Sequence, residues 1–252
     1  MKPLPPSVNA EAWAGLHRPI AHRGLWDAER PENSLAAFDA AAAAGYGIEL
    51  DVQLSADGEV IVFHDDRLER LTEGHGRLCD HGVAALGALK LVGGPERLPT
   101  LEQALAVVAG RTLVVVELKV LGGEEGPLEA RVAAILDAYS GPAAVLSFNP
   151  LAVAGFANFS PNRLRGLNSM AYTDAAQWPL NPAQRHGLST LQHVDEAKPH
   201  FLSLGLDMLP SFEAAALRAG GMPVAAWTVR GPAQWDRVRL FCDTPIFEGW
   251  RP

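Results

Sequence analysis

The sequence lacks several features that mark particular classes of protein. Its 252 residues contain no apolar run near the ~20 residues that a membrane helix needs, so no stable membrane insertion is expected. The two cysteines, Cys79 and Cys242, show neither CxxC nor Cys/His spacing, which argues against a disulfide framework or a zinc site. The first 13 residues contain one lysine and no apolar stretch of roughly 7–15 residues as in a secretory signal, which favours a cytoplasmic location.

Positive charge is also scarce. The chain has 21 Lys and Arg against 29 Asp and Glu, a formal net charge of -8 at pH 7. Without an overall positive field, nucleic acid is not an expected partner, and any phosphate-bearing partner must be held at a local site. Hydrophobic residues make up 48% of the chain, enough for a large core, and α/β barrels often form one domain of about 200–250 residues. The sequence leaves open whether the chain forms a homo-oligomer.

Short strand-like runs alternate with Ala- and Leu-rich helical stretches, a pattern that predicts a parallel sheet wrapped by helices. Eight such runs suit an α/β fold of the TIM type, a closed (β/α)8 barrel. We place this domain at residues 17–252, after an N-terminal extension at 1–16, of which 8–16 would cover the barrel floor or replace a missing last helix. The predicted strands are 19–22, 47–52, 113–119, 143–148, 163–169, 201–206, 224–229 and 245–249.

Residues typical of helix starts support several of the helices. Thr100 and Gln103 form the pattern of a capping box. Asn33 is a candidate cap of the Ala-rich helix that follows it, with support of a functional site, together with Glu32, as the equal alternative. The clearest predicted helices are 34–44, 101–108, 128–139, 212–219 and 233–241.

An Asp-Gly pair at 57–58 predicts a tight turn between two strand-like runs. A two-residue loop there pairs residues whose numbers add to 115, which places Asp51 opposite His64. Glu49 lies two residues before Asp51, so its side chain shares that face of the strand. We therefore expect Glu49, Asp51 and His64 to meet, with 60–64 as an additional antiparallel strand outside the barrel count.

A third acidic residue, Glu117, interrupts an apolar run at the C-terminal end of a predicted barrel strand, and Lys119 shares its face. That end of a TIM-type barrel carries the active site, although a salt bridge is an alternative role for Glu117 alone. Three carboxylates about 5 Å apart repel one another by roughly 3 kcal/mol per pair at an effective dielectric near 20. A cation among them would remove this repulsion, and a carboxylate-rich set without thiolates favours Mg²⁺ or Ca²⁺ over zinc.

The first predicted strand ends in His22-Arg23-Gly24, which brings two further polar side chains to the barrel mouth. The planar guanidinium of Arg23 suits phosphate oxygens. Two imidazoles that titrate near neutrality can act as acid and base, so His22 and His64 are candidate catalytic residues.

These residues belong to a longer set of motifs that resembles the glycerophosphodiester phosphodiesterase family. The set spans nearly the whole chain in the family's order, and HRG, PEN, ExD and HD together are far more specific than a lone histidine or carboxylate pair. The matching strings are AHRG at 21–24, PENS at 31–34, IELDVQLSADGEVIVFHD at 48–65, LPTLEQAL at 98–105, VVELK at 115–119, LSFN at 146–149 and AWTV at 226–229.

The resemblance implies a TIM-type barrel with a small insertion between the second strand and the second helix, within about 52–98. It also implies hydrolysis of a glycerophosphodiester to sn-glycerol 3-phosphate and an alcohol. Trp227 is expected to pack against the glycerol carbons, with core packing as the alternative. The implied roles are Glu49, Asp51 and Glu117 for a divalent metal, His22 and His64 for acid/base catalysis, and Arg23 and Lys119 for phosphate binding.

The end of the chain departs from the family pattern. Members often carry an ITDxP-like string where this sequence has IFEGWRP, so either Glu248 replaces that aspartate or the contact from the eighth strand is lost. A phospholipase D-like enzyme for lysolipids would need an apolar face at the mouth, for which Leu25, Trp26 and 84–92 are the candidates. A silent phosphodiester-binding barrel would be expected to lack one of the charged groups. The attacking group, water or a substrate hydroxyl, stays open.

Overall fold

Eight parallel strands close into a ring, which confirms the predicted TIM-type barrel. The computed structural model describes residues 9–120, 126–174 and 180–252. The first strand pairs with both the second and the last, so the sheet has no open edge there. In ring order the strands are β1 (Ile20–His22), β2 (Gly47–Leu54), β4 (Val114–Leu118), β5 (Ala143–Ser147), β6 (Leu164–Ser169), β7 (Phe201–Gly205), β8 (Val224–Val229) and β9 (Thr244–Phe247).

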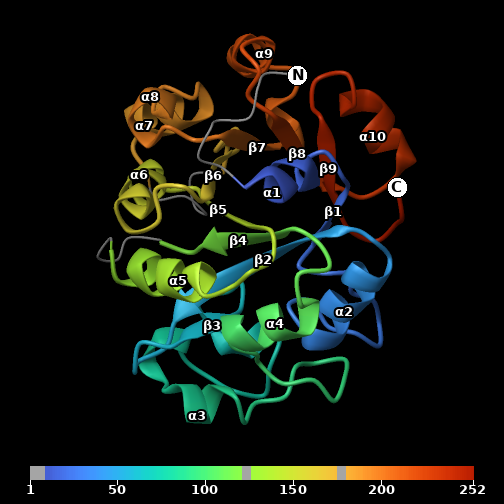
Figure 1. Cartoon of the computed structure of the whole chain (residues 1–252), viewed down its shortest axis with the longest axis vertical. Coiled ribbons are helices and arrows are strands. Elements are labelled where there is room, and N and C mark those ends of the chain that lie inside the picture. Colours follow the sequence, from blue (N-terminus) through green and yellow to red (C-terminus); the bar gives the residue numbers. More distant parts are fainter. Residues whose placement is uncertain (1–8, 121–125, 175–179) are drawn as a thin grey trace.

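Helices surround the ring of strands (Figure 1). All five predicted helices are present, and the capping box of Thr100 and Gln103 is confirmed. Three further helices, at Pro150–Phe159, Pro182–Ser189 and Val194–Ala197, were not predicted from the sequence. The helices around the barrel are α2 (Leu35–Ala43), α4 (Leu101–Val108), α5 (Pro127–Asp137), α6 (Pro150–Phe159), α7 (Pro182–Ser189), α8 (Val194–Ala197), α9 (Phe212–Ala219) and α10 (Pro232–Val238).

The cap predicted for α2 is wrong by one residue. Ser34 is the N-cap, since its hydroxyl accepts a hydrogen bond from the backbone N–H of Ala37 at 3.2 Å. Asn33 instead adopts a left-handed conformation, with φ of 56°, and its side chain turns into the barrel. Asparagine tolerates this conformation better than most residues.

Helix α1 (Ala10–Gly15) closes the floor of the barrel, one of the two places expected for 8–16. Its buried Ala12 and Trp13, with Leu16, share an apolar cluster with inward-facing strand residues such as Leu113 and Ile246. In Figure 1, α1 lies across the centre of the ring. The lower barrel is therefore filled by side chains.

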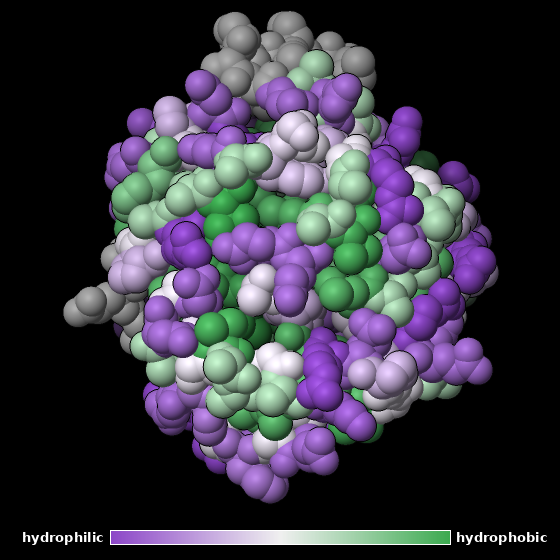
Figure 2. Space-filling model, turned by 60° about the horizontal axis from the view of Figure 1, so that its bottom comes forward, coloured by the Kyte–Doolittle hydropathy of each residue, from purple (hydrophilic) through white to green (hydrophobic). Residues whose placement is uncertain are grey.

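The predicted insertion between the second strand and its helix lies at the bottom of Figure 1. It contains β3 (Val60–Val62), the short 3₁₀ turns η1 (Leu68–Arg70) and η2 (Leu78–Asp80), and α3 (Val83–Leu86). On the face seen in Figure 2, which brings this end forward, apolar residues surround a central group of polar ones. The insertion packs around its own core of Ile61, Phe63, Leu68, Leu78, Leu86, Leu91 and Leu98.

The predicted register of the β2–β3 hairpin is wrong by one residue. Val52 pairs with Val62, and the N–H of Ser55 donates to the carbonyl of Glu59 at 2.9 Å, which leaves a three-residue loop. Gly58 adopts φ of 83° in this loop, the left-handed position that three-residue hairpins require. Phe63 therefore lies opposite Asp51, and its N–H donates to the Asp51 carbonyl at 3.0 Å.

Candidate active site

Alternation along the strands sorts the barrel interior into an apolar lower layer and a polar mouth. Side chains two residues apart lie on the same face of a strand. Where a strand buries an inward-facing residue low in the barrel, the residue two positions later therefore lies at the C-terminal mouth. Paired as lower residue and mouth residue, these are Ile20 and His22, Val115 and Glu117, Leu146 and Phe148, Ala225 and Trp227, and Ile246 and Glu248.

Three acidic side chains from β2 and β4 meet at this mouth. Carboxylate oxygens of Glu49, Asp51 and Glu117 lie within 4.8 Å of one another, and all three residues are buried. The cluster follows directly from the sheet, since Asp51 and Glu117 are register partners on neighbouring parallel strands. The convergence expected from strand alternation is present.

Two cationic side chains neutralise part of this cluster. The Nζ of Lys119 lies 2.9 Å from Asp51 Oδ1 and 2.5 Å from Glu117 Oε1, and the Nε of Arg23 lies 3.2 Å from Asp51 Oδ2. Burial by itself would raise the pKa of Asp51, but Lys119 and Arg23 outweigh it and hold that pKa far below its usual range. Burial likewise opposes the charge of Lys119, yet the two carboxylates raise its pKa.

Glu49 has a different environment from the other two acids. Its Oε2 accepts the backbone N–H of Arg23 at 3.1 Å, whereas its Oε1 is buried with no hydrogen-bond partner among the described residues. Burial, together with the negative charges of Asp51 and Glu117, raises the pKa of Glu49 well above its ordinary value. A buried oxygen without a donor, beside two further carboxylates, fits the all-oxygen ligand set of a hard divalent cation.

Two asparagines hold the acids in place. Asn33 Nδ2 donates to Asp51 Oδ2 at 2.9 Å, and Asn168 Nδ2 donates to Glu117 Oε2 at 3.1 Å. Sequence reasoning noted Asn33 but missed Asn168. The signal for Asn168 was an amide side chain near the C-terminal end of a predicted barrel strand, two positions after Gly166.

His22 is oriented by the acid that departs from the family pattern. Its Nδ1 lies 2.6 Å from Glu248 Oε2, and its Nε2 lies 3.9 Å from Glu49 Oε2. Burial lowers the pKa of His22 more than the contact with Glu248 raises it. Burial alone would raise the pKa of Glu248, but His22 and Arg230 together lower it to about 2. Glu248, directly after β9 (Thr244–Phe247), therefore provides a contact to His22 from the last strand.

His64 also reaches the acid cluster, although the hairpin register differs from the prediction. Strand β3 ends at Val62 and the backbone bends at residues 64–66, which brings His64 close enough for its charge to lower the pKa of Asp51. The Nδ1 of His64 lies 2.6 Å from Asp65 Oδ1. Its side chain is 34% exposed, against 15% for His22. The two imidazoles thus differ in their access to solvent.

The loop after β1 supplies the remaining supports. Arg23 Nη1 donates to Glu32 Oε1 at 2.7 Å, and the N–H of Asn33 donates to the Arg23 carbonyl at 3.0 Å. Across the mouth, Trp227 is half-buried and meets Phe148 edge-on, with ring centroids 5.6 Å apart. The structure therefore places all eight predicted site residues at one end of the barrel.

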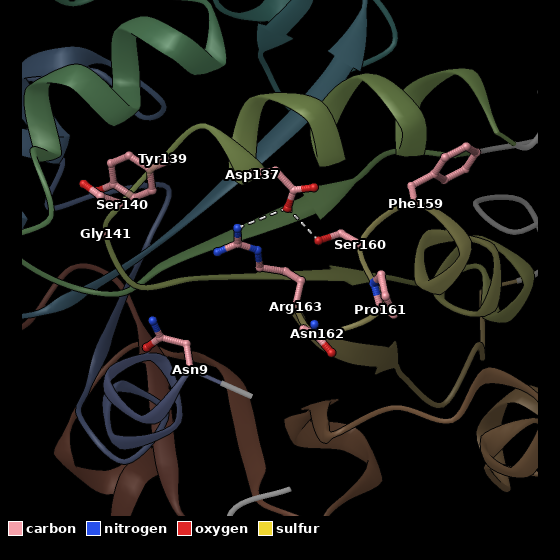
Figure 3. Close-up of a pocket in the computed structure, with 10 residues that line it drawn as sticks. All are labelled: Asn9, Asp137, Tyr139, Ser140, Gly141, Phe159, Ser160, Pro161, Asn162 and Arg163. Carbon is pink, nitrogen blue, oxygen red and sulfur yellow. Dashed lines mark hydrogen bonds and ion pairs between the residues drawn. The ribbon is translucent and has the colours of Figure 1, made fainter. Parts of the chain in front are cut away.

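A separate pocket of about 490 Å³ lies at the other end of the barrel (Figure 3). It is formed by the segments that lead into β5 and β6. Its polar groups largely satisfy one another, since Ser160 Oγ donates to Asp137 Oδ1 at 2.8 Å and Arg163 Nη2 donates to the Leu136 carbonyl at 2.6 Å. This pocket is not part of the candidate active site.

A (β/α)8 barrel with clustered carboxylates, two cations and two histidines at its mouth defines a TIM-barrel hydrolase of phosphate esters. Residues 22–247 match the glycerophosphoryl diester phosphodiesterase family. The chain belongs to this family, which confirms the resemblance seen in the sequence motifs. Within the described residues, no helix has the length and apolar character needed to cross a membrane.

Individual relatives agree with this assignment. The chain is 31% identical over 218 residues to YhdW of Bacillus subtilis (strain 168), a protein named as a glycerophosphodiester phosphodiesterase, and the match covers 83% of this chain and 85% of that protein. Glycerophosphodiester phosphodiesterase 1 of Mus musculus is 41% identical over 95 residues, which cover 34% of this chain and 28% of that protein. A phosphodiesterase of Oleispira antarctica, solved with the product sn-glycerol-3-phosphate, is 26% identical with a TM-score of 0.80 over 94% of both chains.

Proposed function

We propose that the protein hydrolyses small-molecule glycerophosphodiesters to sn-glycerol 3-phosphate and an alcohol, with Mg²⁺ or Ca²⁺ held by Glu49, Asp51 and Glu117. The observation that carries this proposal is the buried acid cluster, with the unpartnered oxygen of Glu49 on one side and Lys119 and Arg23 on the other. The product bound to the Oleispira antarctica relative supports the choice of substrate. The cytoplasmic location remains a prediction from the sequence.

The charges of the site support a phosphodiester as the ligand. The three carboxylates outnumber the two cations, Lys119 and Arg23, and leave one net negative charge. A divalent cation would reverse the sign and leave one net positive charge, which complements the single negative charge of a phosphodiester. Without the cation, burial and the neighbouring carboxylates raise the pKa of Glu49, and the cluster has no net positive charge to attract the substrate.

The roles of the charged residues follow from their positions. A divalent cation in this site would polarise a non-bridging phosphate oxygen and stabilise the charge that develops in the transition state. Arg23 and Lys119 would donate hydrogen bonds to the phosphate oxygens, and Arg23 offers a planar fork suited to that geometry. Both are tied to Asp51, so they are held at the mouth before substrate arrives.

The two histidines would transfer the protons. Since Glu248 occupies Nδ1 of His22, Nε2 is the atom free to take a proton from the attacking hydroxyl, and we assign His22 as the base. His64 is held through Nδ1 by Asp65 and is more exposed, so we assign it to protonate the leaving alkoxide. The same pair serves either attacker, water or the glycerol hydroxyl of the substrate. Trp227, edge-on to Phe148, would pack against the glycerol carbons.

The test is a release assay with purified protein and glycerophosphocholine, followed as sn-glycerol 3-phosphate. We expect activity to disappear with a chelator and to return with Mg²⁺ or Ca²⁺. A matched control is Glu102→Gln, an exposed acid far from the cluster, which should leave the activity within about threefold, whereas Glu49→Gln should abolish it. Activity that survives thorough chelation would contradict the metal assignment.

The same assay with a lysolipid tests the phospholipase D-like alternative. Leu25 and Trp26, the apolar candidates nearest the mouth, are half-buried and offer little surface for a lipid. In the predicted segment 84–92, Val92 is the exposed large apolar residue. We therefore expect hydrolysis of the water-soluble substrate and little of the lysolipid.

A further inference from the structure

Arg70, the last residue of η1 in the insertion, joins two loops of the barrel mouth. Its Nε and Nη2 donate to Asp65 at 2.5 and 2.9 Å. Its Nη1 and Nη2 donate to Glu32 at 3.2 and 2.8 Å. Glu32 belongs to the loop between β1 and α2, whereas Asp65 follows β3. One guanidinium thus binds two carboxylates, each through two hydrogen bonds.

Each of these carboxylates holds a residue of the candidate active site. Glu32 Oε1 accepts a hydrogen bond from Arg23 at 2.7 Å as well as from Arg70. Asp65 Oδ1 lies 2.6 Å from Nδ1 of His64. The contacts therefore run without interruption from Arg23, which would bind the phosphate, through Arg70 to His64, which would protonate the leaving group.

The base of Arg70 is fixed by the core of the insertion. Leu68 is buried, its N–H donates to the Gly76 carbonyl at 3.1 Å, and its carbonyl accepts from both the N–H and the hydroxyl of Thr72. These hydrogen bonds hold the short turn that carries the Arg70 side chain. A site is held more accurately by such a support than by a free loop.

We propose that Arg70 is a positioning residue, which sets the distance between the phosphate-binding Arg23 and the proton donor His64 through Glu32 and Asp65. This inference rests on the proposed function, because it assigns a task to Arg70 within that reaction. The insertion would accordingly take part in assembling the active site.

Arg70 should matter more for geometry than for stability. Its side chain is 46% exposed, and ion pairs in contact with water contribute little to folding. A lysine in its place offers a single ammonium group and cannot donate two bonds to each of two carboxylates. Positional errors of about 1 Å in a catalytic group can cost roughly 100-fold in rate.

The first test compares Arg70→Met and Arg70→Lys with Arg77→Met as a matched control. Arg77 belongs to the same insertion and pairs with the exposed Asp66 instead of Glu32 or Asp65. Both Arg70 variants should lower kcat/KM by about 10- to 100-fold with an unchanged thermal midpoint, whereas Arg77→Met should stay within about threefold. Full activity in Arg70→Lys would overturn the proposal, since a single positive charge would then suffice.

The contact of Arg70 with Glu32 and its contact with Asp65 can be tested separately by enzyme kinetics. Glu32→Gln should mainly raise KM, because it loosens Arg23, and Asp65→Asn should mainly lower kcat, because it loosens His64. In an Arg70→Met background, each of these substitutions should cost less than in the wild type, since the linkage is already broken. Additive losses would show that Glu32 and Asp65 act independently of Arg70.

Binding of sn-glycerol 3-phosphate, measured by calorimetry with Mg²⁺ present, separates this inference from the proposed function. If the wild type shows no turnover while Arg70→Met weakens binding at least fivefold, the proposed reaction fails and the positioning of Arg23 stands. If the wild type turns over and Arg70→Met matches it in both turnover and binding, the positioning role fails and the reaction stands.

Discussion

Replacing Glu248 by glutamine tests whether the acid at the end of the last strand orients His22. The side chain keeps its shape, but the 2.6 Å contact with Nδ1 of His22 loses its charge. Hydrogen bonds to charged groups contribute about 1.5–3 kcal/mol, and each 1.36 kcal/mol corresponds to roughly a tenfold change in rate. We therefore expect kcat to fall by about 10- to 150-fold.

The expected loss is confined to kcat. Glu248 lies behind His22, on the side away from Glu49, so KM for glycerophosphocholine should change by less than about threefold. The measurement is the initial rate of sn-glycerol 3-phosphate release at several substrate concentrations, alongside thermal unfolding to verify that the variant is folded.

The matched control is Arg230→Gln. Arg230 binds the other oxygen of Glu248 at 2.7 Å and is largely exposed, so its removal leaves the contact with His22 in place. Its kcat should remain within about threefold of the wild type. Two results would refute the reasoning: wild-type kcat in Glu248→Gln, or an equal loss in both variants.

Three further predictions follow from neighbouring features. Asn168→Leu removes the donor that holds Glu117, so calorimetry should show Mg²⁺ or Ca²⁺ affinity about 10- to 100-fold weaker; an unchanged affinity would contradict this support. Gly166→Ala should destabilise the fold by about 1–3 kcal/mol in urea unfolding, because a Cβ would overlap the buried Phe201 ring; wild-type stability would contradict this. Burial lowers the pKa of His200 to about 4, so the unfolded chain binds a proton at this residue more readily than the folded chain does. The free energy of unfolding should therefore fall by about 1–2 kcal/mol from pH 6.5 to pH 4, a range that allows for the partial exposure of His200. His200→Asn should lose that part of the pH dependence in urea titrations, and an identical slope in both proteins would count against it.

Strand alternation was sufficient to predict the acid cluster. Glu49, Asp51 and Glu117 interrupt apolar runs in their strands, and the pleat, a local property, fixes the face on which each side chain lies. The parallel pairing of β2 with β4 then brings Asp51 beside Glu117. His64 was correctly expected near the acid cluster, but the hairpin register from which this was predicted is wrong by one residue. Ala56 joins Asp57 and Gly58 in a three-residue hairpin loop, which shifts the predicted register by one residue. A bend after β3, which alternation does not encode, returns His64 to the cluster.

Contacts between loops were beyond sequence reasoning. The bridge of Arg70 to Glu32 and Asp65 depends on where three separate segments meet, and a periodic pattern carries no such information. Asn33 fits a helix-cap pattern as well as a place at the site, and its left-handed backbone, which turns it toward Asp51, becomes apparent only in the fold.

Helix α1 packs Trp13 and Leu16 into the lower end of the barrel. Among the described residues, the mouth is therefore the side from which a ligand can approach the carboxylates. In the proposed reaction, sn-glycerol 3-phosphate would bind Lys119 and Arg23 on that same side, as the substrate does. A high concentration of this product should therefore slow turnover by competition for the site.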